Sequence, residues 1–176
     1  MTITTEPAAT SESWGELRSK TVYWHDPKVA LEAAPGRTGL EYLTAMANGE
    51  IPGAPIGGLL GMRAVSASAG EIVFACTPDE SMYNPIGLVH GGVACTLLDS
   101  AAGCAVHTTL PANVGYTSIE IKVNYLRPIH AHTGELIVRG WVTKPGRRVA
   151  FAEADVRDAD GAVLATATST CLILGG

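Results

Sequence analysis

The sequence predicts an α+β domain in which a curled antiparallel sheet wraps around one long central helix. Two strand-like segments come first, an apolar helical segment follows over about residues 90–107, and four longer strand-like segments complete the chain. One helix covers only one face of such a sheet, so the sheet has to curl around it. The helical segment is rich in Ala and Leu, as expected if the sheet surrounds most of it at close range.

The strands are predicted from period-two alternation and from the turns between them. In residues 118–126, Ile119, Ile121 and Val123 alternate with polar neighbours. Turns are expected at 69–70, at 145–146 and at the Asp-Gly pair 160–161. The other strands are expected within residues 59–68, 71–78, 134–144, 147–158 and 162–174.

The first 57 residues are interpreted as an extension with short helices and a linker, and the domain itself is placed at 58–176. Residues 1 to about 20 are small and polar, which predicts a mobile tail. Asp26 and Pro27 predict the N-cap and first residue of a short helix. A second short helix is expected within residues 38–50, and the Pro- and Gly-rich stretch 51–58 is interpreted as a linker.

Composition limits the function classes. Hydrophobic residues make up 47% of the chain and charged residues 16%, so a sizeable core and apolar surface for a second subunit are both expected. The formal net charge of −5 argues against non-specific nucleic-acid binding. The first residues lack a secretory pattern, and no apolar run reaches the ~18 residues of a membrane span. We therefore expect a cytoplasmic protein without membrane attachment.

The cysteines show no C-x-x-C pair. Cys95 and Cys104 are nine residues apart and fall on opposite sides of the predicted helix, so they neither bridge nor share a metal. We expect all four thiols, Cys76, Cys95, Cys104 and Cys171, to be buried and reduced.

The start of the central helix is unusual for a core element. Residues 84–92 read NPIGLVHGG, and the helix carries one carboxylate, Asp99. On a helical wheel, Gly92, Thr96, Asp99 and Gly103 form a narrow stripe opposite a broad apolar face. A solvent-facing Asp or a plain glycine turn would explain either feature alone. Together they suggest chemistry, because a helix start offers free N–H groups for an oxyanion and a carboxylate serves as base or nucleophile.

The pattern N-P-I-G-L-V-H-G-G-x-x-x-x-L-L-D over residues 84–99 resembles the signature of hotdog-fold acyl-CoA thioesterases. The phenylacetic-acid-degradation type, related to the 4-hydroxybenzoyl-CoA thioesterases, is the nearest group. The downstream stretches NYLRP and GRRVAFAEADVRDADG are also similar, and the resemblance covers about residues 58–172. It weakens over the first 50 residues, which either cap the acyl tunnel or extend the dimer.

The resemblance implies a role for each site residue. The N–H of Gly91 polarises the thioester carbonyl with help from Asn84, and Asp99 is a general base for water or a nucleophile. Ser118, or alternatively Thr117, positions the water. His90 is expected to support the loop from Asn84, with direct catalysis as the second possibility, and Gly92 is grouped with the substrate-binding residues.

Helix geometry adds an expectation that does not depend on the family. Gly91 and Asp99 are eight residues apart, about 12 Å at 1.5 Å per residue. Reacting groups have to lie ~3 Å from a shared atom. One chain therefore does not supply both groups to one carbonyl. A twofold dimer with two shared sites is expected, and the family resemblance favours a dimer of dimers.

The substrate, an aryl- or medium-chain acyl-CoA, needs contacts for its phosphates. Basic residues that suit phosphate are Arg127, Lys144, Arg147 and Arg148, although each also fits an ordinary charged turn. His130 and His132 lie on one side of an extended segment but have no third ligand nearby in sequence, so no metal or other cofactor is expected. The acyl pocket is expected to involve the helix stripe, residues 117–125 and the region around Met82 and Tyr83.

These observations predict an acyl-CoA thioesterase that releases a free acid and coenzyme A. A non-catalytic acyl-CoA-binding module is the alternative, although it has no need of Asp99. A hotdog dehydratase or hydratase would show a different His and acid pattern, and the combined motif argues against a purely structural domain.

Overall fold

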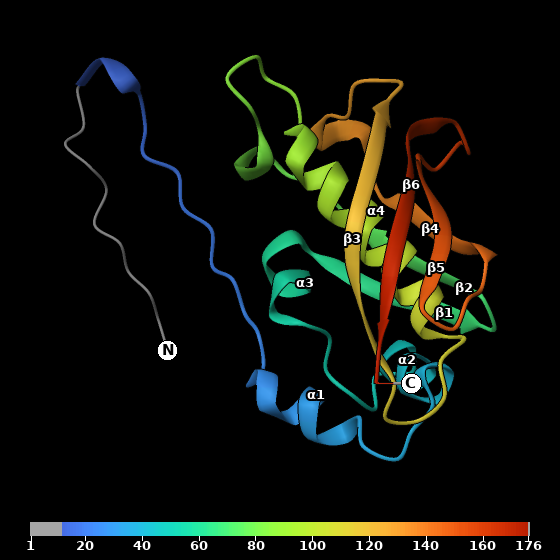
Figure 1. Cartoon of the computed structure of the whole chain (residues 1–176). Helices are drawn as coiled ribbons and strands as arrows, with labels where there is room; N and C mark the ends of the chain where they lie inside the picture. Colours follow the sequence, from blue (N-terminus) through green and yellow to red (C-terminus); the bar gives the residue numbers. More distant parts are fainter. Residues whose placement is uncertain (1–11, 176) are drawn as a thin grey trace.

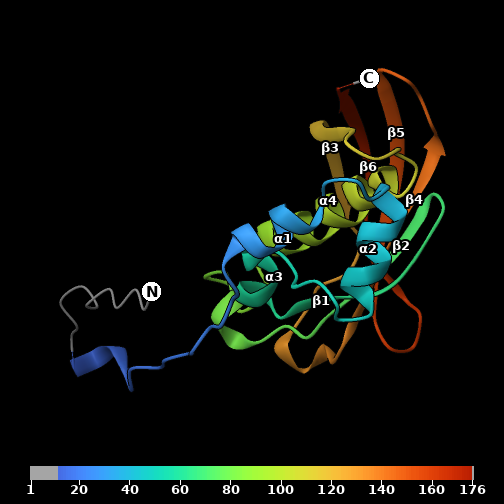
Figure 2. The same ribbon diagram turned by 90° about the horizontal axis from the view of Figure 1, so that it is seen from below.

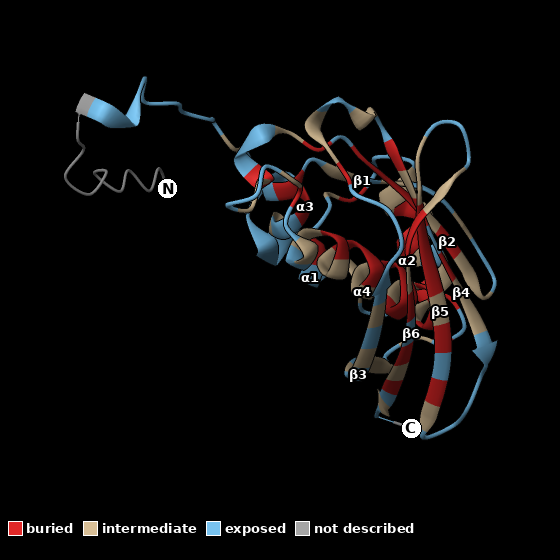
Figure 3. Cartoon of the chain, turned by 90° about the horizontal axis from the view of Figure 1, so that it is seen from above, coloured by how far each residue is buried: buried red, intermediate tan, exposed pale blue. Residues whose placement is uncertain are grey.

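The computed structural model describes residues 12–175 and contains one six-stranded antiparallel sheet around a central helix. The sheet order is β1-β2-β4-β5-β6-β3, and the strands curl around α4 (Figures 1 and 3). The predicted α+β architecture is thus confirmed. The elements of this unit are β1 (Met62–Ser68), β2 (Glu71–Cys76), α4 (Gly91–His107), β3 (Gly115–Tyr125), β4 (Leu136–Lys144), β5 (Val149–Arg157) and β6 (Val163–Leu174).

The core lies between α4 and the inner face of the sheet. Leu97, Leu98 and Ala101 on α4 are fully buried, as are Ile72 and Val138 on the facing strands. Small residues permit a close approach, since a Cβ added at Gly140 of β4 would lie 2.1 Å from the Ala101 carbonyl oxygen. Small residues were expected on the helix to permit this close approach, and a glycine on the facing strand contributes to it as well.

The sheet does not close on itself, and β1 and β3 are its two end strands. In the described structure β3 is hydrogen-bonded to β6 on one side only. Large apolar side chains are exposed along this edge, with Ile119 at 55% and Tyr125 at 59%. An 11-residue strand with an open, apolar edge is a surface that proteins usually cover by pairing.

Three short helices precede the sheet, and α2 lies at the C-terminal end of α4 (Figures 1 and 2). Asp26 caps α1 (Pro27–Ala33) by accepting the Lys28 N–H, and Thr38 with Glu41 forms a capping box on α2 (Gly39–Ala47). The expected linker at 51–58 is wrong in part, because Pro55 begins α3 (Pro55–Leu60). Proline at the first helical position supports a helix, which the composition of this stretch concealed.

The extension is packed against the sheet. Helices α2 and α3 lie on β1, and Leu43 of α2 belongs to the same core cluster as the α4 side chains. Gly39 at the start of α2 abuts the end of α4, where an added Cβ would lie 1.8 Å from the His107 carbonyl oxygen. The expected boundary at residue 57 falls inside α3. Part of the expected polar tail, residues 1–11, lies outside the described structure.

Three single-turn 3-10 helices complete the described structure, at Glu12–Trp14 (η1), Glu80–Met82 (η2) and Ala131–Thr133 (η3). No helix among the described residues is both long and apolar enough to cross a lipid bilayer.

The four cysteines are free, but only two are buried as expected. Cys76 and Cys171 are buried, whereas Cys95 and Cys104 are half-buried. The expectation is wrong for Cys95, whereas the Cys104 thiol is shielded from solvent although the residue as a whole is half-buried.

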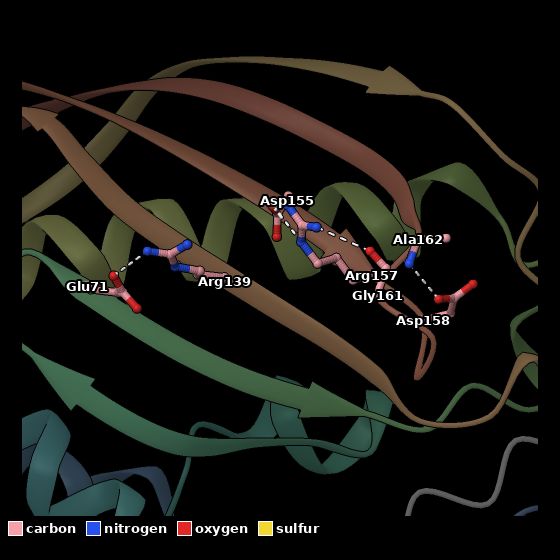
Figure 4. A network of polar contacts seen from close by, with 7 residues as sticks. All are labelled: Glu71, Arg139, Asp155, Arg157, Asp158, Gly161 and Ala162. Carbon is pink, nitrogen blue, oxygen red and sulfur yellow. Dashed lines mark hydrogen bonds and ion pairs between the residues drawn. The ribbon is translucent and has the colours of Figure 1, made fainter.

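The face of the sheet away from α4 carries a network of charged side chains (Figure 4). Arg139 of β4 pairs with Glu71 of β2 at 2.6 Å. Arg157 of β5 donates to one oxygen of Asp155 through two nitrogens, at 2.6 and 3.0 Å. Asp155 is only 3% exposed, and its second carboxylate oxygen has no hydrogen-bond partner in the described structure.

Candidate active site

A tight loop leads into the N-terminal end of α4. The Asn84 side-chain oxygen accepts the N–H groups of Ile86 and Leu88, both at 3.1 Å. Gly87 has a φ of 79°, a conformation that glycine adopts at little cost. Asn84 therefore shapes this loop, and its oxygen is engaged within the loop.

His90 is the N-cap of α4. The side-chain Nδ1 of His90 accepts the Gly92 N–H at 2.8 Å. The backbone N–H of His90 donates to the Met82 carbonyl at 2.8 Å. No described hydrogen bond joins the His90 side chain to the loop from Asn84, and the imidazole instead caps its own helix directly after that loop. This leaves the N–H of Gly91 without an acceptor among the described residues.

Gly91 is held from the side by β3. The Tyr125 hydroxyl donates to the Gly91 carbonyl at 3.1 Å, and an added Cβ at Gly91 would lie 3.0 Å from the Tyr125 ring. Asn84, Gly91, Tyr125 and Arg127 share the lining of an open cavity of about 460 Å³. The Gly91 position thus admits no side chain without displacing this ring.

Asp99 lies half-buried in the middle of α4 and faces β3. The Ser118 hydroxyl donates to its Oδ1 at 2.8 Å. Both residues, with exposed Thr117 beside them, line a second cavity of about 440 Å³. No cation forms an ion pair with Asp99 in the described part of the chain.

The two cavities have no lining residue in common. The predicted oxyanion donor and the predicted carboxylate therefore lie in separate places on one chain, as the helical rise of about 12 Å requires.

The wall behind Asp99 includes two residues that the sequence analysis did not select, Tyr116 and Cys104. The Tyr116 ring lies over Gly103, where an added Cβ would be 2.7 Å from a ring carbon. Gly103 is thus buried and not on an accessible stripe as expected. The sequence could have indicated Tyr116 as a site residue. Residues two apart on a strand share a face, so Tyr116 and Ser118 point to the same side of β3.

Both of these groups are neutral at physiological pH. Burial raises the pKa of the Cys104 thiol to about 11 and raises the pKa of the Tyr116 phenol well above its usual value. The thiol and the phenol lie 3.7 Å apart. Neither group therefore contributes a charge to this cavity.

The pocket differs from the expected one in its remaining walls. Met82 and Tyr83 do not line it, since Met82 is buried in the core and the Tyr83 hydroxyl accepts the Ala131 N–H. Their places are taken by residues of the N-terminal extension, including Met46, Gly53, Ala54 and Ile56.

The predicted basic residues divide between the two ends of α4. Arg127 lines the Gly91 cavity. Arg147 and Arg148 line a cavity of about 800 Å³ beside residues 109–111, which follow the end of α4, whereas Lys144 is exposed nearby and does not line it.

His130 and His132 are stacked with ring centroids 4.7 Å apart. Within residues 12–175 no group of three or more His, Cys, Asp or Glu is placed to hold a metal.

The fold is shared with a class of thioester hydrolases, and comparisons with known proteins show that relationship. The family model described as the thioesterase superfamily matches residues 86–165. Human acyl-coenzyme A thioesterase 13 is 31% identical over 108 residues, 60% of this chain and 75% of the human protein. A putative esterase of Halobacterium salinarum is 38% identical over 102 residues, 55% of this chain and 66% of that protein.

A solved structure shows the same fold. A putative thioesterase from Ralstonia eutropha JMP134, described as a phenylacetic acid degradation-related protein, superposes with a TM-score of 0.67 at 29% identity. The match covers 74% of this chain and 98% of that chain. The chain belongs to the thioesterase superfamily, and it is a thioester hydrolase whose activity, at the level of the family, is that of an acyl-CoA thioesterase.

Proposed function

We propose that the protein hydrolyses an aryl- or medium-chain acyl-CoA at two sites, each shared by the two chains of a dimer. The observation that carries this proposal is the separation of two complementary halves. Gly91 presents a free N–H in one cavity, and Asp99 with Ser118 presents a carboxylate without a cation in another. Each half lacks what the other supplies.

The open edge of β3 supports a dimer that joins the halves. In an isologous twofold pair, two β3 strands run antiparallel, so the start of one strand faces the end of the other. Ser118, near the start of β3, holds Asp99, and Tyr125, at its end, holds Gly91. Pairing the two edges therefore brings Asp99 of one chain toward the partner's Gly91. It also covers the apolar edge.

The chemistry follows from these groups. Asp99 takes a proton from a water held by Ser118 or Thr117, and the water oxygen bonds to the thioester carbon. The partner's Gly91 N–H donates to the oxyanion, and Asn84 assists by fixing the loop before it. The C–S bond then breaks, the carbonyl reforms, and the thiolate of coenzyme A receives the proton. The products are the free acid and coenzyme A.

A direct attack by Asp99 is the other route open to this carboxylate. It forms an acyl-aspartyl anhydride and expels the thiolate, and water then cleaves the anhydride. A single turnover in ¹⁸O-labelled water separates the routes. The nucleophile route leaves the first product acid without label when water attacks the Asp99 carbon, whereas the general-base route labels it.

The same pairing offers phosphate contacts from both chains. The Arg148 carbonyl accepts the Ile173 N–H, so the turn with Arg147 and Arg148 lies beside the start of β3. Arg127 follows the end of β3. In the antiparallel pair these cations approach the site from opposite sides, which suits the phosphates of coenzyme A. We extend the proposal to a dimer of dimers, which sedimentation equilibrium tests.

The experiment is free-thiol release from a panel of aryl and aliphatic acyl-CoAs by the parent and by Asp99→Asn. We expect turnover by the parent and a loss of about 10²–10⁴-fold in kcat in the variant, the usual contribution of a general base. Thr96→Ala, one turn away on the same helix, is the matched control and should retain turnover. Equal rates for parent and Asp99→Asn would overturn the mechanism. Binding of coenzyme A by calorimetry with no turnover of any acyl-CoA would favour the non-catalytic module.

A further inference from the structure

The cavity beside Asp99 is built from two parts of the chain that are far apart in sequence. One wall comes from α4 and β3 and carries Asp99, Ser118 and Tyr116. The opposite wall comes from the end of α2, the connection after it and α3, which lie along the side of α4 that the curled sheet leaves open (Figure 2). The lining residues from this second wall are Met46, Gly53, Ala54, Ile56 and Gly57.

The second wall is apolar, and so is the floor between the walls. Met62 and Ala64 of β1 and Phe74 of β2 form most of this floor, and Phe74 is only 4% exposed. Arg63 is the one lining cation, and it is engaged with Glu135 at 2.7 Å. No free cation in this lining is thus available for an acyl group that carries its own carboxylate, whereas an uncharged apolar chain fits.

A further cavity of about 410 Å³ adjoins the first. The two share six lining residues: Met46, Gly53, Ala54, Met62, Arg63 and Ala64. The outer side of this cavity is formed by the strap of residues 23–25, whose backbone packs on α3. Met46 therefore borders both cavities. Methionine is flexible, so its side chain is suited to yield to a longer ligand.

We propose that the N-terminal extension is the acyl-specificity element of the enzyme. Met46, Gly53 and Ile56 form the wall against which an uncharged apolar acyl chain packs, and the strap of residues 23–25 encloses the end of a longer chain. This inference rests on the proposed function, because it takes Asp99 as the place of the thioester carbonyl. Residues 23–57 of the extension thus select the substrate, while the sheet and α4 supply the chemistry.

The test compares kcat/KM for acetyl-CoA, octanoyl-CoA and dodecanoyl-CoA in three variants. Gly53→Phe fills the cavity without a backbone clash, since an added Cβ at Gly53 meets nothing within 4 Å. We expect it to lower the ratio of dodecanoyl to acetyl turnover by about tenfold or more. Met46→Ala enlarges the cavity and should raise the same ratio by about threefold or more, in line with the worth of a few methylenes.

The matched control is Leu59→Ala on α3. Leu59 is 51% exposed, close to the 41% of Ile56, but it lines neither cavity. Its dodecanoyl-to-acetyl ratio should equal that of the parent, whereas Ile56→Ala should change it. Thermal unfolding of each variant shows whether it is folded.

The outcomes separate the two proposals. Parent turnover together with unchanged ratios in folded Gly53→Phe, Met46→Ala and Ile56→Ala would overturn the role of the extension and leave the proposed function standing. Absence of turnover in the parent for every acyl-CoA would overturn the proposed function and this inference with it. Opposite shifts of the ratio in Gly53→Phe and Met46→Ala would support the role of the extension.

Discussion

Two carboxylates on opposite sides of the sheet differ in their surroundings, which suit Asp155 to a structural role and Asp99 to the reactive role that the proposed function gives it. Asp155, on the outer face, is 3% exposed, and one of its oxygens accepts two bonds from Arg157. Asp99, on the α4 side, is half-buried in a cavity and accepts one bond from the Ser118 hydroxyl. One oxygen of Asp155 is engaged by the guanidinium and the other is buried, so neither is free to react. Asp99 instead has a second oxygen without a described partner beside a cavity, where it is available to accept a proton or to attack a carbon.

The contrast predicts that loss of Asp155 lowers stability and that loss of Asp99 lowers activity. After the loss of turnover in Asp99→Asn, the largest expected effect is the loss of stability in Asp155→Ala. Asp155→Ala should lower the free energy of unfolding by about 1–3 kcal/mol, less than for a fully buried pair because Arg157 is 41% exposed. Asp99→Ala should change it by less than about 1 kcal/mol, since one hydrogen bond is lost and helix propensity is gained. Urea unfolding of the two variants measures this, and the reverse order would remove the contrast.

The Ser118 hydroxyl is the one described hydrogen-bond partner of the Asp99 side chain, so its removal sharpens the comparison. Ser118→Ala should lower kcat about tenfold, the usual worth of one hydrogen bond to a charged group. Thr117→Ala is the matched control, because Thr117 lines the same cavity without a bond to Asp99. A larger loss in Thr117→Ala than in Ser118→Ala would assign the water to Thr117.

Arg148 is exposed and has no ion-pair partner in the described structure, whereas Arg157 is paired with Asp155. Arg148 is therefore available to a ligand. Arg148→Ala should raise KM for acyl-CoA about three- to tenfold with little change in kcat, as expected when binding is lost equally in ground and transition states. Steady-state kinetics at low salt measures the effect. A fall in kcat equal to that in kcat/KM would mean that Arg148 acts in the transition state.

The smallest effect is expected at His107, where the extension meets the end of α4. Its ring lies between Tyr42 and Tyr116, and burial lowers its pKa. Below the ordinary His value of about 6.5 the unfolded chain binds a proton that the folded chain does not. Stability should therefore fall as pH drops from about 7 toward 5 and stay level above 7. Thermal unfolding of His107→Gln should show a flatter profile over this range, and an unchanged profile would place the dependence elsewhere.

The sequence predicted those features that depend on local periodicity. The helix and the strands follow from repeats of 3.6 and 2 residues, whereas the selection of Ser118 as a site residue rested on the family resemblance. The sequence did not predict the contact of Tyr116 with Gly103 or the neighbourhood of Asp155 and Arg139, because these depend on strand register and helix placement. It also missed α3 and the apolar wall, since glycine and proline in residues 51–58 have two interpretations, as a linker or as a tightly packed short helix.

Complementation between two inactive variants tests the shared site most directly. Gly91→Pro removes the N–H while keeping a residue that suits the first position of a helix, and Gly91→Ala, which keeps the N–H, controls for the contact with Tyr125. Gly91→Pro and Asp99→Asn are co-refolded in equal amounts and assayed for thiol release. With a site shared across the dimer, half of the dimers carry one intact site, and activity should return to about a quarter of the parent value. Activity no higher than that of the separate variants would show that each chain holds a complete site and would contradict the account.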